Sequence, residues 1–443
     1  MSEKLSFPHA KREAVDQALA LIQDPAGEGC RSFTRTYPDA ARIAAESADQ
    51  RVAIGMDIPP LAGVPISIKD LFDVKGEATT AGSQVLVDAS PANADAVVVG
   101  RLRRAGAAII GKTNMTEFAF SGLGINPHYG TPTCAWDRSS RRIPGGSSSG
   151  AAISVADGMA VAAIGTDTGG SCRIPAAFNG IVGFKPSAQT VPLSGALPLS
   201  PSYDSIGPLA RDVSTCAKVY EVLSDKTLSL VSRPAETLTI GVVKNYVMDG
   251  VDPAVGKAYE RTLRRLSSFG IDMHDVTLPV LNALTDMFGN GGLVAAEAYQ
   301  WHKALLDSSE AAYDPRVSVR IRRGNLSSAD DYISLLMLRQ TLIEQWTAQI
   351  AQFDVVIMPT VPIIPPTIDS LADDIVYGEV NLLVLRNPTL VNVMDGCAIS
   401  IPCHQSGEAP VGLMLAAANG KDAMLLGIAR TLECLLSMDI YRG

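Results

Sequence analysis

The chain has 443 residues, of which 47% are hydrophobic and 19% are charged. This much apolar surface can be buried against the entropy of ordering the chain, so intrinsic disorder is excluded. The formal net charge of −9 argues against a nucleic-acid-binding surface, because such a surface needs clustered lysine and arginine.

The predicted elements alternate along the chain in an order that indicates an α/β fold. In the first half they are helices at 10–23 and 38–50, a buried strand with a loop at 61–74, a helix at 95–105, a strand at 107–110, a loop rich in Gly, Ser and Pro at 122–150, and an internal helix at 150–163. In the second half they are a strand at 238–243, a helix that begins at Asp252 and Pro253 and ends at Gly270, a helix at 329–352, strands at 355–358, 398–402 and 411–415, and a helix at 422–436. We therefore predict a single large domain over residues 1–443, with a mixed central β-sheet covered by helices on both faces.

Export, membrane insertion and disulfide formation find no support in the sequence. The first 23 residues carry charges throughout and lack the apolar segment of an export signal. The most apolar stretch, residues 151–165, is interrupted by Asp157 and is too short to span a bilayer. The seven cysteines form no C-x-x-C pair, which predicts reduced thiols that are buried or half-buried. We expect a cytoplasmic protein.

One motif points to a nucleotide but fails on physical grounds. Residues 106–113 read Gly-Ala-Ala-Ile-Ile-Gly-Lys-Thr, which matches the phosphate-loop pattern G-x-x-x-x-G-K-[ST] letter for letter. A phosphate loop needs an open backbone whose N–H groups face the anion and a helix that starts at the lysine. The residues between the glycines are instead typical of a buried strand. We therefore expect Lys112 at the end of a strand and reject nucleotide hydrolysis.

Two Gly-Gly-Ser turns, at residues 145–147 and 169–171, are better candidates for chemistry. Each lies beside an apolar segment, which predicts backbone packed closely at a shared site rather than a flexible linker. The successive backbone N–H groups of the second turn would suit an oxyanion.

A serine nucleophile also needs a base, and lysine is the best candidate here. None of the five histidines lies in a segment with a Ser-His-Asp signature, whereas Lys69 closes the apolar run at 64–69. Burial would lower the pKa of Lys69 and leave part of it neutral. The residues alone leave a second interpretation open, in which Lys69 forms a structural ion pair with Asp70 or Asp73.

Four segments together resemble the amidase signature family of amide hydrolases: GVPISIKD, GKTNMTEFA, PGGSSSG and GTDTGGSCRIPA. The resemblance covers most of residues 60–210 and returns at 354–362 and 398–416. It implies the amidase signature fold, with a signature core at about 60–210 and a C-terminal half, about 237–443, that completes the sheet and the loops on the substrate side. It also implies an amidase that cleaves the C–N bond of a small-molecule carboxamide and releases ammonia or an amine.

The resemblance assigns a role to each motif residue. Ser171 would be the nucleophile that forms the acyl-enzyme, Ser147, which follows a cis peptide bond, would relay the proton, and Lys69 would be the ultimate base. The oxyanion hole would consist of the backbone N–H groups of Thr168, Gly169, Gly170 and Ser171. The resemblance implies no metal and no organic cofactor. The expected partner is a small-molecule amide, without nucleic acid or membrane, and a homodimer is one assembly that the prediction allows.

Departures from the family pattern define the alternatives. Cys172 replaces the Ile or Val of many members and is predicted to pack, and Arg173 is predicted to form structural hydrogen bonds. The glutamine-hydrolysing chains of aminoacyl-tRNA amidotransferases, known as their A subunits, belong to the same family and use charged residues of the C-terminal half to hold glutamine. The sequence at 385–388, Leu-Arg-Asn-Pro, lacks the expected acidic residue. That role therefore remains an alternative function, and a catalytically silent binding module is a weaker one.

Overall fold

The structure is a computed structural model that describes residues 11–437. The first ten residues of the segment in which no export signal was found lie outside the described range. Within that range, eleven strands form one sheet. Their bounds are β1 Phe33–Thr36, β2 Pro65–Lys69, β3 Ala108–Thr113, β4 Ala162–Asp167, β5 Val182–Lys185, β6 Ser205–Ala210, β7 Thr239–Val243, β8 Asp272–Val276, β9 Val355–Pro359, β10 Cys397–Pro402 and β11 Gly412–Ala417.

The sheet is mixed, as predicted. The strands follow the order β1-β3-β2-β4-β6-β5-β10-β11-β9-β7-β8. β2 runs parallel to both β3 and β4, and β7 runs parallel to both β8 and β9. The strands between these two groups pair antiparallel. The parallel pairing of β2 with β4 brings the carboxyl ends of two signature strands to one edge of the sheet.

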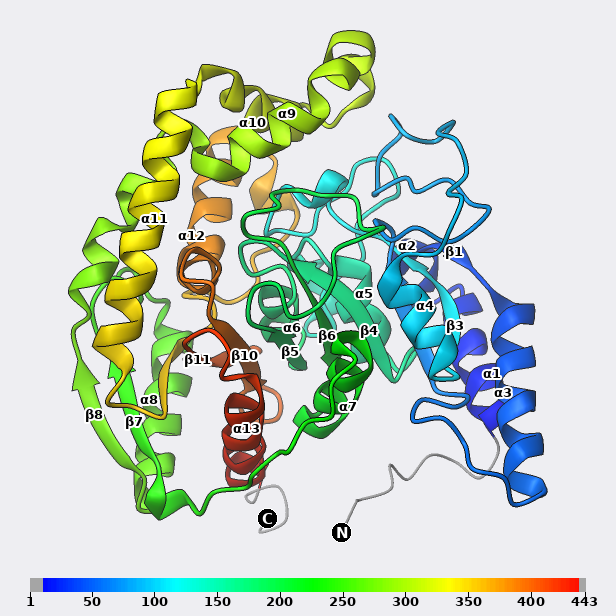
Figure 1. The fold of residues 1–443 in the computed structure, drawn as a ribbon, viewed down its shortest axis with the longest axis horizontal. Helices are drawn as coiled ribbons and strands as arrows, with labels where there is room; N and C mark the ends of the chain where they lie inside the picture. The colour runs from blue at the N-terminus through cyan, green and yellow to red at the C-terminus, as the bar shows by residue number, and fades with distance from the viewer. Residues whose placement is uncertain (1–10, 438–443) are drawn as a thin grey trace.

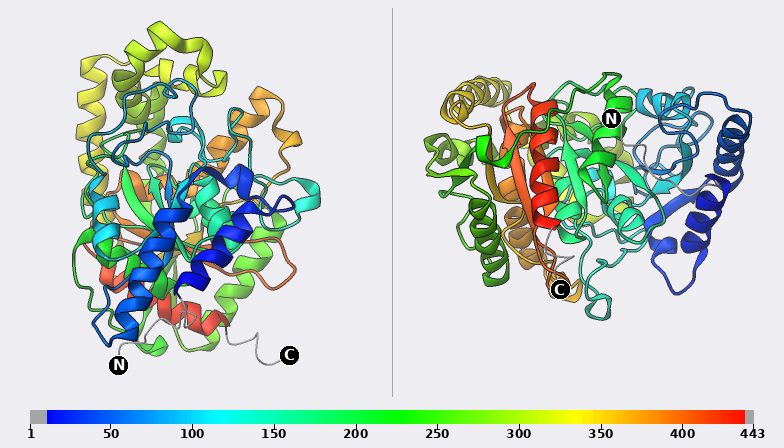
Figure 2. Two further views of the ribbon diagram at one scale, coloured as in Figure 1. Left: turned by 90° about the vertical axis from the view of Figure 1, so that its right-hand side faces the viewer. Right: turned by 90° about the horizontal axis from the view of Figure 1, so that it is seen from below.

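Helices cover both faces of the sheet (Figures 1 and 2). Their bounds are α1 Lys11–Gln23, α2 Gly29–Ser32, α3 Pro38–Ala53, α4 Val97–Arg104, α5 Ser149–Ala156, α6 Arg173–Phe178, α7 Val213–Ser224, α8 Pro253–Ser268, α9 Gly292–Ser309, α10 Pro315–Arg322, α11 Ala329–Ile350, α12 Asp374–Val393 and α13 Asp422–Ser437. Alternation along β4 separates the two faces, because successive side chains of a strand point to opposite sides. Ala162 and Ile164 pack in the cluster that α4, α7 and α13 complete, whereas Ala163 packs with α5 and α6.

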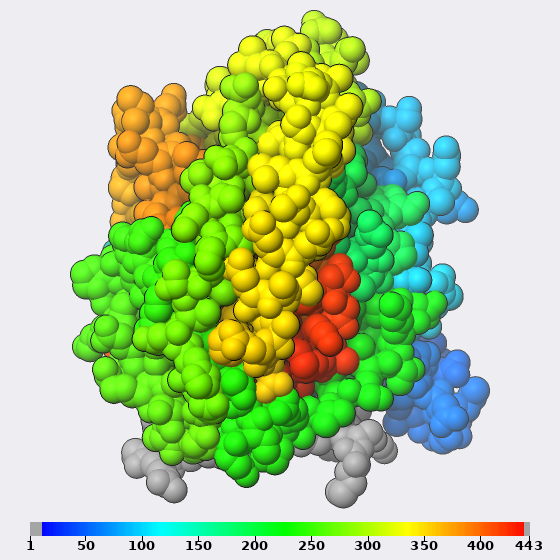
Figure 3. Space-filling model, turned by 60° about the vertical axis from the view of Figure 1, so that its left-hand side comes forward, coloured from blue at the N-terminus to red at the C-terminus, as the bar shows by residue number. Residues whose placement is uncertain are grey.

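The second half of the chain extends the sheet and covers its far end. Leu342, Trp346 and Ile350 form the buried side of α11 and pack in one cluster with Val356 and Met358 of β9. The opposite side of α11 forms part of the molecular surface (Figure 3, yellow). None of the helices within residues 11–437 combines the length and the apolar character needed to cross a membrane.

Two sequence-based predictions were wrong. The predicted helix at 150–163 is split, because Asp157 ends α5 and Gly158 turns the chain at φ +77°, so that β4 begins at Ala162. The prediction that the cysteines are buried or half-buried fails for two of them. Cys30 and Cys434 are exposed, and the other five are buried. No disulfide is present among the described cysteines.

The prediction that the phosphate-loop motif forms a strand is confirmed. β3 continues through Lys112 to Thr113, and no helix starts at the lysine. The Lys112 side chain is buried, and its Nζ lies 3.6 Å from Oδ1 of buried Asp70.

This buried pair generates a stability prediction. Lys112→Met should lower the free energy of unfolding by about 3–5 kcal/mol, because it leaves the Asp70 carboxylate uncompensated in the interior. Urea unfolding measures the effect, and adding Asp70→Asn to the same chain should recover part of the loss. A wild-type stability for Lys112→Met would contradict the structural role of the pair.

Candidate active site

Lys69 ends β2 and extends its amine toward the neighbouring strand and the first Gly-Gly-Ser turn. The parallel register places Ile68 opposite Ile164, so Lys69 comes beside the last residues of β4. The Lys69 side chain is fully buried, and its Nζ donates to Oγ of Ser147 at 2.7 Å and to Oγ1 of Thr166 at 2.8 Å. The structure thus joins the predicted base to the predicted proton relay.

Burial lowers the pKa of Lys69 to about 7, and the charges of Cys172, Asp204 and Asp167 oppose this shift without reversing it. The ion pair that the sequence left open for Lys69 is not formed. Asp70 is held by Lys112, Thr80 and the backbone N–H of Gly82, and Asp73 accepts from Thr79. Lys69 is therefore a buried amine that can be neutral near pH 7.

The first Gly-Gly-Ser turn lies directly before α5. The Gly146–Ser147 peptide bond is cis, as the resemblance implied. The Ser147 carbonyl accepts from the N–H of Thr116 at 3.1 Å, and the N–H of Ser148 donates to the carbonyl of Ser171 at 3.3 Å. The two serine turns are consequently neighbours, as the prediction of a shared site requires.

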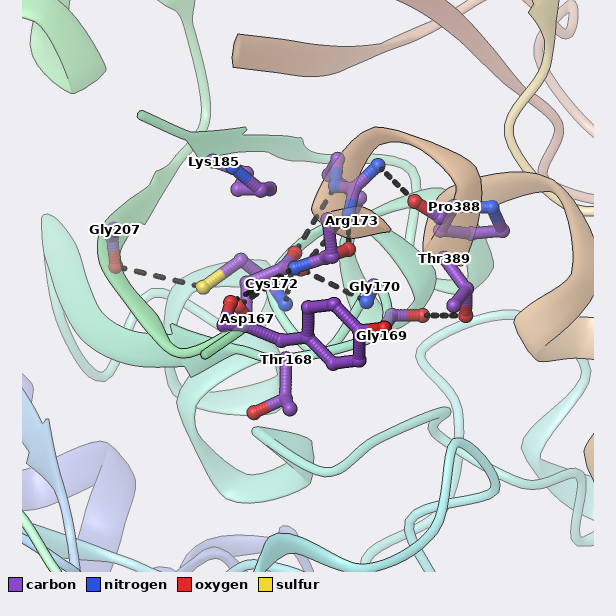
Figure 4. Close-up of polar contacts among 12 residues, drawn as sticks. Asp167, Thr168, Gly169, Gly170, Cys172, Arg173, Lys185, Gly207, Pro388 and Thr389 are labelled. Atoms are coloured by element: carbon purple, nitrogen blue, oxygen red, sulfur yellow. Dashed lines mark hydrogen bonds and ion pairs between the residues drawn. The ribbon is translucent and has the colours of Figure 1, made fainter. Parts of the chain in front are cut away.

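The second turn connects β4 to α6, and an ion pair inside the protein holds it (Figure 4). Asp167 accepts from the backbone N–H groups of Gly170 and Cys172 at 2.8 and 3.1 Å. It also accepts from Nε and Nη2 of Arg173 at 3.0 and 2.8 Å. Burial alone would raise the pKa of Asp167, but the Arg173 guanidinium holds it well below its usual range. The carboxylate therefore stays charged and fixes the backbone on both sides of Ser171.

α12 holds the same turn from the opposite side. Arg173 Nη1 donates to the carbonyl of Pro388 at 2.9 Å, and Nη2 donates to Oδ1 of Asn392 at 2.7 Å. Oγ1 of Thr389 donates to the carbonyl of Gly169 at 3.1 Å. These contacts confirm the structural role predicted for Arg173, and Cys172 is buried as predicted.

One of the four backbone N–H groups expected to form the oxyanion hole has a partner inside the protein. The N–H of Gly170 donates to Oδ1 of Asp167. The backbone of Gly170 has a positive φ of +117°, a conformation that glycine adopts readily. The N–H groups of Thr168, Gly169 and Ser171 have no acceptor in the part of the chain that the structure describes. Three of the four predicted donors are thus free of a partner among the described residues.

Asp204, just before β6, is a site residue that the sequence reasoning missed. It is half-buried, and it accepts from Oγ1 of Thr168 and from the backbone N–H groups of Leu199 and Ser200. Burial raises the pKa of Asp204 to about 6, against the effect of these hydrogen bonds. No spacing in the sequence connects Asp204 to the Gly-Gly-Ser turns, whereas Thr166 and Asp167 could have been found inside the second motif.

Two adjoining cavities lie beside this site. One of about 390 Å³ is lined by Thr166, the Lys69 partner, by Asp204 and by apolar side chains of the segment 193–201. A larger one of about 890 Å³ shares Asp204 with the first and extends toward α9 and α11, where Glu297 and Tyr332 line it. The cavities thus extend from Thr166, which contacts Lys69, toward α9. Within residues 11–437, no group of three or more His, Cys, Asp or Glu residues could hold a metal ion.

Comparisons with known proteins agree with this geometry. A family model described as amidase matches residues 20–426. A 2-amino-5-chloromuconic acid deaminase of Comamonas testosteroni is 35% identical over 435 residues, which cover 95% of this chain and 93% of that protein. The A subunit of a glutamyl-tRNA(Gln) amidotransferase from Acidothermus cellulolyticus is 32% identical, covering 98% of this chain and 92% of that protein. A solved structure described as an amidase superimposes with a TM-score of 0.86 at 31% identity, covering 96% of each chain. The chain belongs to the amidase signature family of enzymes that hydrolyse C–N bonds.

Proposed function

We propose that this enzyme hydrolyses a small-molecule carboxamide through an acyl-enzyme on Ser171. The observation that carries the proposal is the buried amine of Lys69, which has no carboxylate partner within residues 11–437 and donates to Ser147 at 2.7 Å. An amine that loses its proton near pH 7 can accept one from a serine hydroxyl. The Comamonas relative is named for the removal of an amino group, which also breaks a bond between carbon and nitrogen, although that nitrogen is not part of a carboxamide.

Acylation follows from the arrangement of these groups. Neutral Lys69 accepts the hydroxyl proton of Ser147 while Ser147 accepts that of Ser171, and Oγ of Ser171 attacks the carbonyl carbon. The backbone N–H groups of Thr168, Gly169 and Ser171 hold the oxyanion. Collapse breaks the C–N bond, and the leaving nitrogen takes the proton back from Lys69 through Ser147. The first product is ammonia or an amine, and the acyl group remains on Ser171 as an ester.

Deacylation repeats the sequence with water in place of the amine. Lys69 and Ser147 accept a proton from the water, whose oxygen attacks the ester carbon. The same three N–H groups hold the second oxyanion. Breaking the C–O bond returns the proton to Ser171 and releases the carboxylic acid.

The glutamine-hydrolysing role in an aminoacyl-tRNA amidotransferase is a second candidate, because A subunits of such enzymes align over nearly the whole chain. In the helix that faces the turn, however, the side chain of Arg386 donates to the carbonyls of Val247 and Asp249, and no carboxylate stands at 385–388. Glutamine hydrolysis that depends on a co-purifying partner and tRNA would favour this candidate. Turnover of simple amides by the isolated chain would favour the first.

Ser171→Ala should abolish amide hydrolysis and labelling by a serine-directed fluorophosphonate, because the acyl group then has no acceptor. Ser147→Ala and Lys69→Ala should each lower kcat by about 10²–10⁴-fold, the usual contribution of a proton-transfer group. Ammonia release from a panel of small amides measures these losses. Wild-type rates from a folded Ser171→Ala protein would refute the assignment, and failure of the wild type to react would favour a silent binding module.

The pH dependence of kcat should follow the protonation of Lys69. Activity should be low at acid pH and rise as the pH passes about 7, because protonated Lys69 cannot accept a proton from Ser147. A pH–rate profile on one amide measures this limb. A rate that falls over the same range would contradict Lys69 as the base.

Lys69→Met should be inactive but no less stable than the wild type at neutral pH. The pKa of Lys69 is lower in the folded state than in the unfolded state, so the folded state loses stability below the unfolded pKa, and the loss is complete below the folded pKa of about 7. Removing the charge should therefore stabilise the protein near pH 7 by up to about 4 kcal/mol, less the lost hydrogen bonds, and the gain should vanish as the pH approaches about 10. Thermal unfolding at several pH values measures this. A large drop in Tm at pH 7 would instead indicate a lysine that is charged in the fold.

A further inference from the structure

Thr168, the first residue of the turn that carries Ser171, is tied to the sheet through its side chain. The antiparallel ladder between β4 and β6 ends at the pair of Asp167 and Ser205, so Thr168 and Asp204 come next and lie opposite each other. The Thr168 side chain points away from Asp167 (Figure 4), and its hydroxyl donates to Oδ1 of Asp204. This contact connects the start of the turn to the segment before β6.

Asp204 is itself held in place by the loop that precedes it. Its Oδ2 accepts from the backbone N–H groups of Leu199 and Ser200 at 3.0 and 3.1 Å. Glu297 of α9 accepts from Oγ of Ser200 at 2.6 Å, and the Tyr332 hydroxyl of α11 donates to Glu297 at 2.9 Å. One oxygen of Asp204 therefore binds the turn, and the other binds a loop that α9 holds.

The direction of the Thr168 N–H depends on this contact. The hydroxyl and the N–H belong to one residue, and a β-branched side chain has little freedom to rotate, so a fixed hydroxyl restrains the backbone that carries it. The next residues, Gly169 and Gly170, have no side chain that could provide such a restraint. An oxyanion donor stabilises the transition state only when it points at the place where the negative charge develops.

The cavities allow the positioning of the turn to be separated from contact with a substrate. Asp204 is among the residues that line both cavities, whereas Thr168 is among those that line neither. A change of the Thr168 side chain therefore alters its contact with Asp204 and leaves the walls of both cavities as they are.

We propose that Asp204 is a positioning residue, which fixes the direction of the Thr168 N–H toward the oxyanion by holding the Thr168 hydroxyl. Asp204 acts through Thr168, so its contribution belongs to the transition state and not to the binding of the substrate. The inference rests on the acyl-enzyme mechanism proposed above.

Two threonine variants test the contact. Thr168→Val keeps the backbone N–H and the branched side chain but removes the hydroxyl. It should lower kcat for a small amide by about 10–100-fold without raising KM, because a displaced donor weakens only the transition state. Thr168→Ser keeps the hydroxyl and should retain most of the wild-type rate. The rates are compared at about pH 9, above the pKa values of Lys69 and Asp204, so that protonation of neither group enters the difference.

A double-mutant cycle shows whether Asp204 acts through Thr168. Asp204→Ala should also lower kcat, and adding Thr168→Val to it should cause little further loss, because both changes break the same contact. Thr215→Val is the matched control, since Thr215 is equally buried and its hydroxyl donates to Asp212 at 2.8 Å at the start of α7. That variant should keep the wild-type kcat. Wild-type kcat for Thr168→Val, a rise in KM in place of the loss in kcat, or additive losses in the double variant would overturn the inference.

A measurement without substrate separates this inference from the proposed function. In protein labelled with ¹⁵N-threonine, Asp204→Ala should lower the order parameter of the Thr168 N–H from the rigid value of about 0.85 toward the flexible range below about 0.6. The Thr215 N–H in the same spectrum should not change. A mobile Thr168 N–H in an enzyme that hydrolyses no amide supports the positioning role, and only the proposed function then fails. A Thr168 signal with unchanged chemical shift and order parameter overturns the positioning role, whatever the activity.

Discussion

The burial of Lys69 without a counterion is the constraint on which the rest of the site depends. A fully buried ammonium is costly, and two hydroxyl partners, Ser147 and Thr166, do not replace a carboxylate. The fold therefore favours the neutral amine. The carboxylates of Asp167 and Asp204 raise the pKa of Lys69, but only in part offset its burial. Arg173 pairs with Asp167, and burial raises the pKa of Asp204. The same environment that penalises the charge in the folded state leaves the amine able to accept a proton, as the proposed base must.

The ion pair between Asp167 and Arg173 fixes the backbone of a glycine-rich turn. Read alone, Thr-Gly-Gly-Ser is a flexible turn, because glycine loses more conformational freedom on folding than any other residue. Asp167 removes that freedom by binding two N–H groups of the turn, and Arg173 anchors Asp167 to α12. The donor that Asp167 occupies, Gly170, is thereby lost to an oxyanion. The remaining donors become fixed before any substrate arrives, which is the condition for effective electrostatic stabilisation.

The sequence predicted the parts of the site that lie within contiguous motifs. An apolar run and two turns marked Lys69 and the two serines as candidates, and the family resemblance assigned their roles. β3 follows from Ala-Ala-Ile-Ile against the phosphate-loop pattern. α12 was not predicted, because Pro388 interrupts its helical pattern. In the structure Pro388 lies inside the helix, and the Pro388 carbonyl accepts a hydrogen bond from Arg173. Asp204 escaped because its role depends on tertiary contact with Thr168. The pairing of distant strands and the packing of helices leave no pattern in the nearby sequence. Both nevertheless determine which polar groups come into contact.

Chemistry and recognition are built from different parts of the chain. The proposed base, relay and nucleophile come from β2, from the turn before α5 and from the turn after β4, all before residue 172 and all close to the centre of the sheet. Another group near them comes from later in the chain: α9 contributes Glu297, which accepts from Ser200 and Ser202 beside Asp204. Substitutions in α9 can change which molecule fits the larger cavity without moving Lys69, because α9 lines that cavity and Lys69 does not. A single reaction scaffold can therefore serve relatives whose names describe different C–N substrates.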